Sequence, residues 1–274
     1  MLEKNKIYCG DNLELIKQLD DNYIDLTVTS PPYDNLRTYN GYSWDFEGLA
    51  KELFRVTKDG GVVVWVVGDA TINGSETGTS FRQAIYFMEC GFNLHDTMIY
   101  YRQSPYPANI RYNQCFEYMF VFCKNKIKTH NLLNAPKRDV GKKASSIVSK
   151  TYRQTDGSIK NIDDEGKKRL IAANKTKEKT RDNIWYIPTG YMVSSSDKIA
   201  YQHPATYPEK LAEDHIISWS NKGDLILDPF LGSGTTAKMA LKNERDFIGF
   251  EISQEYCDIA EKRIAQWREQ KRLF

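Results

Sequence analysis

Two hydrophobic periodicities alternate along the first 125 residues. Residues 24–30 (IDLTVTS) carry several β-branched side chains, and residues 62–69 (VVVWVVGD) form a continuous apolar run, which is typical of a strand buried on both faces of a parallel sheet. Between them, residues 44–61 place apolar side chains at helical spacing and end in two glycines. The pattern therefore predicts a strand, a helix and a second strand in succession.

The alternation continues along the chain. It predicts further helices at residues 10–21, 80–92, 208–220, 234–243 and 254–272. It predicts further strands at residues 7–8, 94–102, 116–124, 224–230 and 246–253. Such an order favours an α/β fold with a mostly parallel, mixed sheet and helices on both faces. Ligands of such folds bind at the carboxyl ends of strands. The stretches TSPPY at 29–33 and DPFLGSGTT at 228–236 both follow strands, so we expect them to face one crevice.

One segment breaks the alternation and carries most of the positive charge. Residues 125–182 are rich in Lys, Asn, Ser and Asp, and their periodicity is weak. Residues 124–183 contain 17 Lys and Arg against 7 Asp and Glu, a net charge of +10, which leaves −8 for the rest of a chain of net charge +2. A basic segment on an acidic body is typical of a module that meets a polyanion. The alternative is a solvated insertion without a partner.

Composition narrows the class of protein. The 274 residues, 41% of them hydrophobic, suffice for one large α/β domain or two small ones. No apolar run approaches the roughly 20 residues of a membrane span, and the first residues are too charged for a signal peptide. The five cysteines are scattered and form no CxxC pair, which predicts reduced thiols in a cytoplasmic protein without a metal site.

The stretch 228–236 combines an acid at a strand end with two glycines at the start of a helix. Gly232 and Gly234 would let the backbone approach a ligand closely. About 20 residues later a strand ends in Glu251, which is placed to accept hydrogen bonds from ribose hydroxyls. No Lys follows the second glycine, and Asp228 would repel a phosphate but suit a cation. We therefore expect a nucleoside without a triphosphate, a description that fits S-adenosylmethionine; a structural strand–helix turn is the alternative.

The prolines of TSPPY end a strand at a point where the ladder cannot continue. They restrain Ser30 and Pro31, so the Ser30 hydroxyl and the Pro31 carbonyl would be held as acceptors. If the nucleoside is a methyl donor, two acceptors that bind the N–H groups of a nucleobase amine would favour the tetrahedral nitrogen of the transition state. Tyr33 would offer a face for stacking, worth roughly 1–3 kcal/mol. Base flipping is then implied; a rigid polar turn is the alternative.

These motifs resemble those of the DNA amino-methyltransferases of the permuted β class, which modify cytosine N4 or adenine N6. TSPPY matches the catalytic motif of that class and DPFLGSGTT its S-adenosylmethionine loop, in the order that the class uses. NIWYIP at 183–188 and HPATYPEKL at 203–211 resemble the segments before the loop, and GDNLELIKQL at 10–19 resembles the segment whose acid meets the cofactor's adenine. The absence of a Pro-Cys dipeptide argues against cytosine C5 chemistry.

The resemblance covers roughly residues 1–125 and 183–265. It implies a circularly permuted, Rossmann-like fold of S-adenosylmethionine-dependent methyltransferases. Residues 1–124 would form the catalytic half of the methyltransferase domain, residues 125–182 a target-recognition region, and residues 183–274 the cofactor-binding half.

The resemblance also assigns roles to single residues. The cofactor would be held by Asp11, Asn12, Ser30, His203, Pro204, Asp228, Phe230, Gly232, Ser233, Gly234, Thr235, Thr236 and Glu251. Asp11 would meet the adenine, and His203 with Pro204 would lie near the methionine end; a helix-entry role is the alternative for His203. The flipped base would be held by Ser30, Pro31, Pro32 and Tyr33.

Basic residues near the catalytic turn and in the basic segment are candidates for contacts to DNA. They are Arg37, Arg102, Arg111, Lys137, Arg138, Lys142 and Lys143. Contacts of the lysines to phosphate would give salt-dependent affinity without sequence information. A solvated side chain is the alternative for each lysine.

The residue at position 30 bears on the choice of base. Adenine-N6 enzymes of the family usually carry Asp or Asn there, whereas Ser is typical of cytosine-N4 enzymes, so we favour cytosine N4 in double-stranded DNA and keep adenine N6 as the alternative. A methyltransferase for protein or RNA and a catalytically inactive DNA-binding module are the alternatives from other classes. The resemblance further raises a homodimer and a cognate restriction endonuclease as partners.

Overall fold

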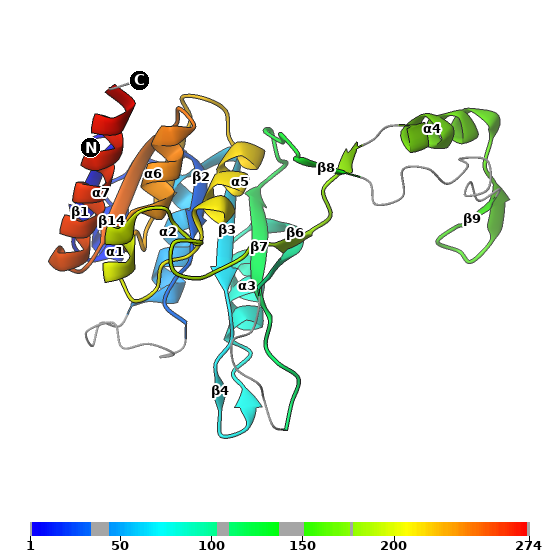
Figure 1. The fold of residues 1–274 in the computed structure, drawn as a ribbon. Helices are drawn as coiled ribbons and strands as arrows, with labels where there is room; N and C mark the ends of the chain where they lie inside the picture. The colour runs from blue at the N-terminus through cyan, green and yellow to red at the C-terminus, as the bar shows by residue number, and fades with distance from the viewer. Residues whose placement is uncertain (1, 34–43, 103–109, 137–150, 176–177, 273–274) are drawn as a thin grey trace. The chain divides into compact units, whose positions relative to one another are not determined.

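The structure, a computed structural model, describes residues 2–33, 44–102, 110–136, 151–175 and 178–272. The chain divides into two compact units, drawn in Figure 1. The first unit comprises Met1–Asn131 with Asn183–Phe274, and the second comprises Leu132–Asp182.

The first unit is built on an eight-stranded sheet in the order β1-β14-β13-β2-β3-β7-β6-β12. The strands are β1 (Lys6–Cys9), β2 (Ile24–Thr29), β3 (Thr57–Val67), β6 (Phe92–Tyr101), β7 (Phe116–Lys124), β12 (Ile184–Tyr186), β13 (Leu225–Asp228) and β14 (Asp246–Glu251). Neighbouring strands are parallel, except that β7 is antiparallel to both β3 and β6.

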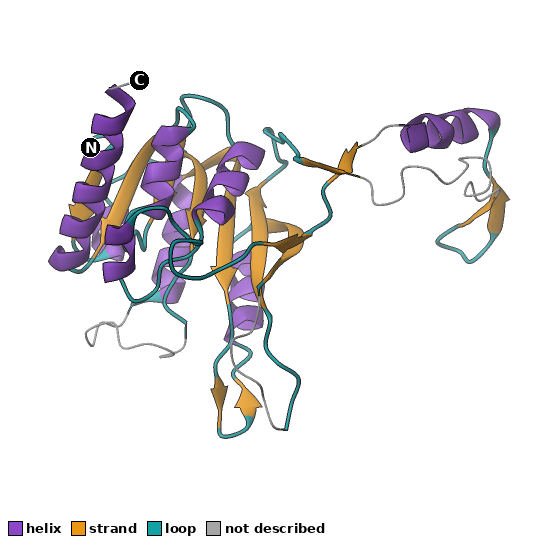
Figure 2. Cartoon of the chain, in the orientation of Figure 1, coloured by secondary structure: helices purple, strands orange, loops and turns teal. Residues whose placement is uncertain are grey.

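Helices cover both faces of this sheet (Figure 2). They are α1 (Asn12–Ile16), α2 (Phe46–Val56), α3 (Thr79–Glu89), α5 (Glu209–Trp219), α6 (Thr235–Lys242) and α7 (Gln254–Arg272), with a short 3-10 helix, η2 (Lys198–Gln202). The helix α2 contacts α1 and α3, whereas α6 contacts α5 and α7, so that each face has its own layer of three helices. The predicted α/β fold with a mixed sheet is confirmed.

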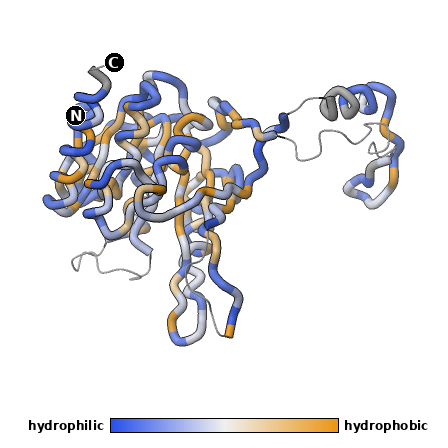
Figure 3. The backbone as a smooth tube through the Cα atoms, viewed as in Figure 1, coloured by the Kyte–Doolittle hydropathy of each residue, from blue (hydrophilic) through white to orange (hydrophobic). Residues whose placement is uncertain are grey.

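The apolar side chains of β3 are buried on both faces of the sheet. Val63, Trp65 and Val67 belong to the core that includes residues of α1, α2 and α3. Val62, Val64 and Val66 alternate with them and are buried as well, on the opposite face. Figure 3 shows hydrophobic positions distributed through the first unit and alternating with hydrophilic ones.

The boundary between α2 and β3 differs from the prediction. The helix ends at Val56 rather than at the two glycines, and residues 57–61 belong to the strand. The Thr57 hydroxyl donates to the Leu53 carbonyl, 2.6 Å away, and closes the last turn. Thr57 then pairs with Ile24 at the start of β2. Tertiary pairing with β2 thus overrides the local glycine signal.

The short elements β12, β4 (Thr71–Ile72), β5 (Ser75–Glu76) and η2 of the first unit were not predicted. The segment 184–186 forms β12, an edge strand parallel to β6. The hairpin of β4 and β5 turns at Asn73 and Gly74, which both have positive φ, as an Asn-Gly hairpin turn requires.

The second unit holds short elements. Its strands β8 (Asn134–Pro136) and β11 (Glu178–Thr180) are antiparallel, as are β9 (Thr151–Arg153) and β10 (Ile159–Asn161), and its helix is α4 (Asp164–Lys175). None of its residues with a described exposure is buried. The unit starts at Leu132, within the predicted region 125–182, and the recognition role of that region stays a prediction. Across the described ranges of both units, every helix is too short or too polar to cross a membrane.

Candidate active site

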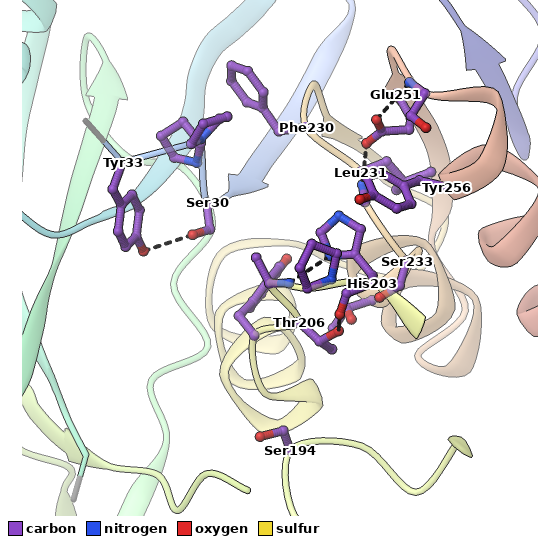
Figure 4. A pocket seen from close by; sticks show the side chains of 18 of the residues that line it. Ser30, Tyr33, Ser194, His203, Thr206, Phe230, Leu231, Ser233, Glu251 and Tyr256 are labelled. Carbon is purple, nitrogen blue, oxygen red and sulfur yellow. Dashed lines mark hydrogen bonds between the residues drawn. The ribbon is translucent and has the colours of Figure 1, made fainter. Parts of the chain in front are cut away.

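A cavity of about 610 Å³ opens at the carboxyl ends of β1, β2, β13 and β14. The predicted site residues that line it are Asp11, Asn12, Ser30, Pro31, Pro32, Tyr33, His203, Pro204, Phe230, Gly232, Ser233, Thr235 and Glu251. Asp228, Gly234 and Thr236 lie behind this lining. The structure thus brings the proline turn and the glycine turn, about 200 residues apart in sequence, to one cavity (Figure 4).

The proline turn holds a short chain of hydroxyl groups. The Ser30 and Tyr33 hydroxyls are 2.9 Å apart, and the Tyr33 hydroxyl donates to Glu117 Oε2 at 3.1 Å. Because the Tyr33 hydroxyl donates its hydrogen bond to the carboxylate, the Tyr33 oxygen accepts a hydrogen bond from the Ser30 hydroxyl. The lone pairs of the Ser30 oxygen then stay available to accept hydrogen bonds from the cavity. Glu117 was missed in the sequence, although a lone acid in the apolar strand FEYMFVFCK was a signal.

The glycine turn depends on backbone freedom at Gly232. Its φ is +53°, in the left-handed region, and a Cβ there would lie 3.2 Å from the His203 ring. Its N–H donates to Glu251 Oε2 at 2.8 Å. The turn therefore needs glycine for its conformation and for the close approach of His203.

Glu251 is the acid expected at a ribose. Its other oxygen accepts from the Ser253 N–H at 3.0 Å, so two backbone groups fix the carboxylate at the cavity wall. Burial raises the pKa of Glu251 above its usual range. A carboxylate has about four lone-pair sites and only two are used by these bonds, so Glu251 retains capacity for ribose hydroxyls.

Asp228 joins the two turns from behind the cavity. Its Oδ1 accepts from the Thr29 hydroxyl at 2.6 Å and from the Phe230 N–H at 3.1 Å. Its Oδ2 is buried and, among the described residues, has no hydrogen-bond partner. Burial raises the pKa of Asp228 to about 6. The cofactor role predicted for Asp228 would thus act by charge, without a place in the cavity lining.

Asp11 and Asn12, which were predicted to lie near the cofactor's adenine, are at the N-terminus of α1. Asp11 caps this helix, because its Oδ1 accepts from the N–H groups of Leu13 at 2.9 Å and Glu14 at 3.1 Å. Asn12 donates from Nδ2 to the Pro229 carbonyl at 3.2 Å, which ties α1 to the glycine turn. Both residues line the cavity, so capping of α1 leaves Asp11 at the cavity wall, and its contact with the adenine stays a prediction.

His203 is held by its neighbours at the cavity wall. Its Nδ1 accepts from the Ala205 N–H at 3.1 Å, and its ring meets the Tyr256 ring edge-on, with centroids 4.3 Å apart. His203 is the C-terminal cap of η2 rather than a residue that enters a helix, and its ring lines the cavity; its role toward the cofactor stays a prediction.

A buried ion-pair network beneath the glycine turn was missed in the sequence. Arg263 of α7 is 1% exposed; it donates to Asp197 at 2.8 Å and to Thr235 Oγ1 at 3.0 Å, and it pairs with Glu209. Lys238 of α6 pairs with the same two acids at 2.6 and 2.9 Å. Burial alone would raise the pKa of both acids, but the bonds and charges of the two cations lower it. The network fixes the segment 194–209 against the glycine turn.

The predicted DNA contacts fall in different places. Arg102 lines the cavity and donates from Nε to Glu117 Oε1 at 3.1 Å. Arg111 donates to the Gly74 carbonyl at 2.6 Å, so it lies at the β4–β5 hairpin. The remaining candidates lie outside the described residues: Arg37, Lys137, Arg138, Lys142 and Lys143.

Comparison with known proteins matches this geometry to a family. A model of N6 and N4 methyltransferases, described as DNA methylase, matches residues 24–262. The orphan methyltransferase M.BamHII of Bacillus amyloliquefaciens is 58% identical over 253 residues, which cover 92% of each chain.

Two solved structures share the fold. The PvuII DNA methyltransferase (cytosine-N4-specific) aligns with a TM-score of 0.68 at 21% identity, covering 98% of this chain and 93% of that one. The complex of M1.HpyAVI with SAM aligns with a TM-score of 0.60 at 23% identity, covering 94% and 98%. Since the family model spans the proline turn, the glycine turn and the strands that carry them, the chain belongs to the N6/N4 DNA methylase family and is a DNA amino-methyltransferase.

Proposed function

We propose that the chain transfers a methyl group from S-adenosylmethionine to the exocyclic N4 amine of a flipped cytosine in duplex DNA. The observation that carries the proposal is the single cavity that receives both the Ser30 oxygen and the glycine turn. An amine acceptor and a nucleoside can only react if their sites open into one space.

The residues on the glycine side suit S-adenosylmethionine. Glu251 is fixed for ribose hydroxyls, and Asp11 stands at the cavity wall for the adenine. The buried Asp228 carboxyl places negative charge beneath a cationic ligand. When bound, the cofactor supplies an electrophilic methyl group on a sulfonium.

The proline side suits an amine that must lose a proton. The exocyclic nitrogen gains positive charge as it bonds to the methyl carbon, and the Ser30 oxygen and the Pro31 carbonyl accept its two N–H bonds. One proton then passes to Ser30 while the Ser30 proton moves to Tyr33 and the Tyr33 proton moves to Glu117, along contacts of 2.9 and 3.1 Å. These proton transfers leave a neutral methylated amine and a protonated Glu117.

Cytosine N4 is preferred over adenine N6 on two grounds. Ser30 is the residue type that the resemblance associates with cytosine-N4 enzymes. The PvuII enzyme, which shares the fold, is cytosine-N4-specific. Adenine N6 remains the second candidate, because the family model covers both reactions.

The test is direct. The purified protein is incubated with labelled S-adenosylmethionine and bacterial DNA, the DNA is digested to nucleosides, and the labelled nucleoside is identified. We expect N4-methylcytosine with the wild type, formed at a rate lower by a factor on the order of 10²–10³ with Ser30→Ala at the same protein concentration. N6-methyladenine would favour the second candidate, and label in protein or RNA alone would contradict DNA methylation.

Two further assignments complete the proposal. The second unit, Leu132–Asp182, would read the target sequence through its basic surface. The 58% identical relative is an orphan methyltransferase, which favours an enzyme without a cognate restriction endonuclease. A homodimer stays a prediction that analytical ultracentrifugation tests.

A further inference from the structure

We propose that Tyr100 and Arg102 read the ring edge of the flipped base next to its amine, and that Arg102 makes this reading favour cytosine. The proposal rests on the proposed function, because it assumes a base whose amine lies at Ser30. It adds two donors that neither the catalytic turn nor the glycine turn supplies.

Strand register brings Tyr100 and Arg102 next to Glu117, which ends the row of hydrogen-bonded groups that starts at Ser30. Tyr100 of β6 pairs directly with Glu117 of β7, so the two side chains lie side by side on one face of the sheet. Arg102 is two positions beyond Tyr100 and therefore lies on the same face. Glu117 binds the Tyr33 hydroxyl and Arg102 Nε, each at 3.1 Å, and all four residues line the cavity.

The Tyr100 hydroxyl has no hydrogen-bond partner within the described ranges. Its side chain is 2% exposed, and its oxygen is one of three buried side-chain polar atoms without a hydrogen bond in the described part of the chain. Leaving such a group unpaired is unfavourable, and phenylalanine at this position would avoid that cost. A buried, unsatisfied hydroxyl at the wall of a binding cavity therefore points to a ligand acceptor.

The Tyr100 hydroxyl is a donor toward that ligand. Burial, with the Glu117 charge beside it, raises the pKa of Tyr100 far above its usual value, so the hydroxyl keeps its proton. Arg102 is a donor in every state, and its guanidinium carries more N–H groups than the one that Glu117 binds. The wall beyond Ser30 thus offers two donors in succession.

This sequence of groups matches cytosine. Next to the N4 amine of cytosine come two acceptors, N3 and O2. Next to the N6 amine of adenine comes one acceptor, N1, and then a C–H group. Tyr100 satisfies the first acceptor of either base, whereas Arg102 finds a second acceptor only in cytosine. With adenine, the Arg102 donor would face a C–H group in place of an acceptor, and a donor left unpaired by the bound base discriminates against that base.

The first experiment tests Tyr100. Turnover is measured for the wild type, Tyr100→Phe and the control Tyr101→Phe, whose side chain is 41% exposed on the other face of β6. The substrates are a duplex with the mapped target base and the same duplex with 3-deazacytosine, which lacks the N3 acceptor. We expect Tyr100→Phe to lower kcat/KM about 10-fold on cytosine and to cause no further loss on 3-deazacytosine.

Other readouts separate reading from structure. Cofactor affinity should not change in Tyr100→Phe, and its melting temperature should not fall, because the lost hydroxyl makes no hydrogen bond to any residue that the structure describes. Equal losses on both duplexes, no loss on either, or a lowered melting temperature would overturn the role of Tyr100.

The second experiment tests Arg102. Arg102→Lys keeps a cation beside Glu117 but removes the planar fork. We expect an about 10-fold lower kcat/KM on cytosine and no further loss on the analogue without the 2-oxo group; additive losses would overturn the role of Arg102. If the labelled product is N6-methyladenine, the cytosine preference of the proposed function fails, while Tyr100 is still tested with 1-deazaadenine.

Discussion

Two turns follow the carboxyl ends of the adjacent parallel strands β2 and β13. One turn is built from prolines, the most rigid residues, and the other from glycines, the most flexible. The turn after β2 uses Pro31 and Pro32, which lack N–H groups, so it presents oxygen acceptors in a fixed direction. The turn after β13 uses Gly232 and Gly234, both with positive φ, so it brings backbone close to His203 and Ala260. The difference is that prolines fix the backbone direction of one wall, whereas glycines allow close packing of backbone against protein side chains in the other.

The largest effect should come from filling the glycine turn. Gly232→Val forces a β-branched residue to a φ of +53° and places its Cβ 3.2 Å from the His203 ring. We expect cofactor binding to fall below detection in calorimetry. The matched control is Gly223→Val, which has a φ of +83° but open space around its Cβ, and which should lower stability without changing cofactor affinity. Retained binding in Gly232→Val would contradict the glycine assignment.

A change in the proline turn should separate chemistry from cofactor binding. Ser30→Ala removes the acceptor of the amine, so we expect kcat to fall by a factor on the order of 10²–10³. Cofactor affinity should stay within about twofold of wild type, because the glycine wall is intact. Rapid-quench methylation and calorimetry measure the two quantities. A loss of cofactor affinity equal to the loss of kcat would show that the two walls are not separate.

The Asp228 carboxyl, which joins the two turns, should make the free energy of unfolding depend on pH. The folded-state pKa of Asp228 is raised to about 6, so its carboxyl stays protonated in the fold at pH values where the unfolded chain has lost the proton. Its contribution to the free energy of unfolding therefore falls as pH rises from about 4 to about 6, by on the order of 1–3 kcal/mol.

The variant Asp228→Asn isolates this contribution. We expect it to unfold at higher denaturant concentration than wild type at pH 8 and at the same concentration at pH 4. If Asp228 also attracts the cationic cofactor, the variant binds it more weakly at pH 8. A variant that is less stable than wild type at pH 8 would contradict the raised pKa.

The smallest effect on kcat should come from removing the Tyr33 hydroxyl. Tyr33→Phe keeps the ring but removes the group that orients Ser30, 2.9 Å away. We expect kcat to fall about 10-fold, as for the loss of one hydrogen bond, with the affinity for DNA little changed. Steady-state kinetics at saturating DNA measure this. A drop as large as that of Ser30→Ala would make Tyr33, rather than Ser30, the principal group of the turn.

The sequence was sufficient for the elements and for the two turns. Hydrophobic periodicity and turn residues act locally, so β2, β3 and the glycine turn could be predicted from short windows. The end of α2 could not, because pairing of Thr57 with Ile24 depends on a strand 33 residues away.

The side chains that complete the site depend on strand register. Glu117 meets Tyr33 and Arg102 because β7 inserts antiparallel between β3 and β6, a pairing with no local signal. Arg263 was not predicted to be buried, although it follows Ile259 by one helical turn and thus falls on the buried stripe of α7. A lone cation on an apolar stripe was the available signal.

The sheet order has a consequence for how the protein is made. Lys6 of β1 pairs with Ile248 of β14, and both β13 and β14 insert between β1 and β2. At 5–20 residues per second, a ribosome needs roughly 10–50 s to deliver β14 after β1 has emerged. A nascent chain therefore displays the proline turn long before any nucleoside pocket exists. Until synthesis has passed β14, β1 lacks its partner β14 and β2 lacks its partner β13, so one edge of each strand stays unpaired.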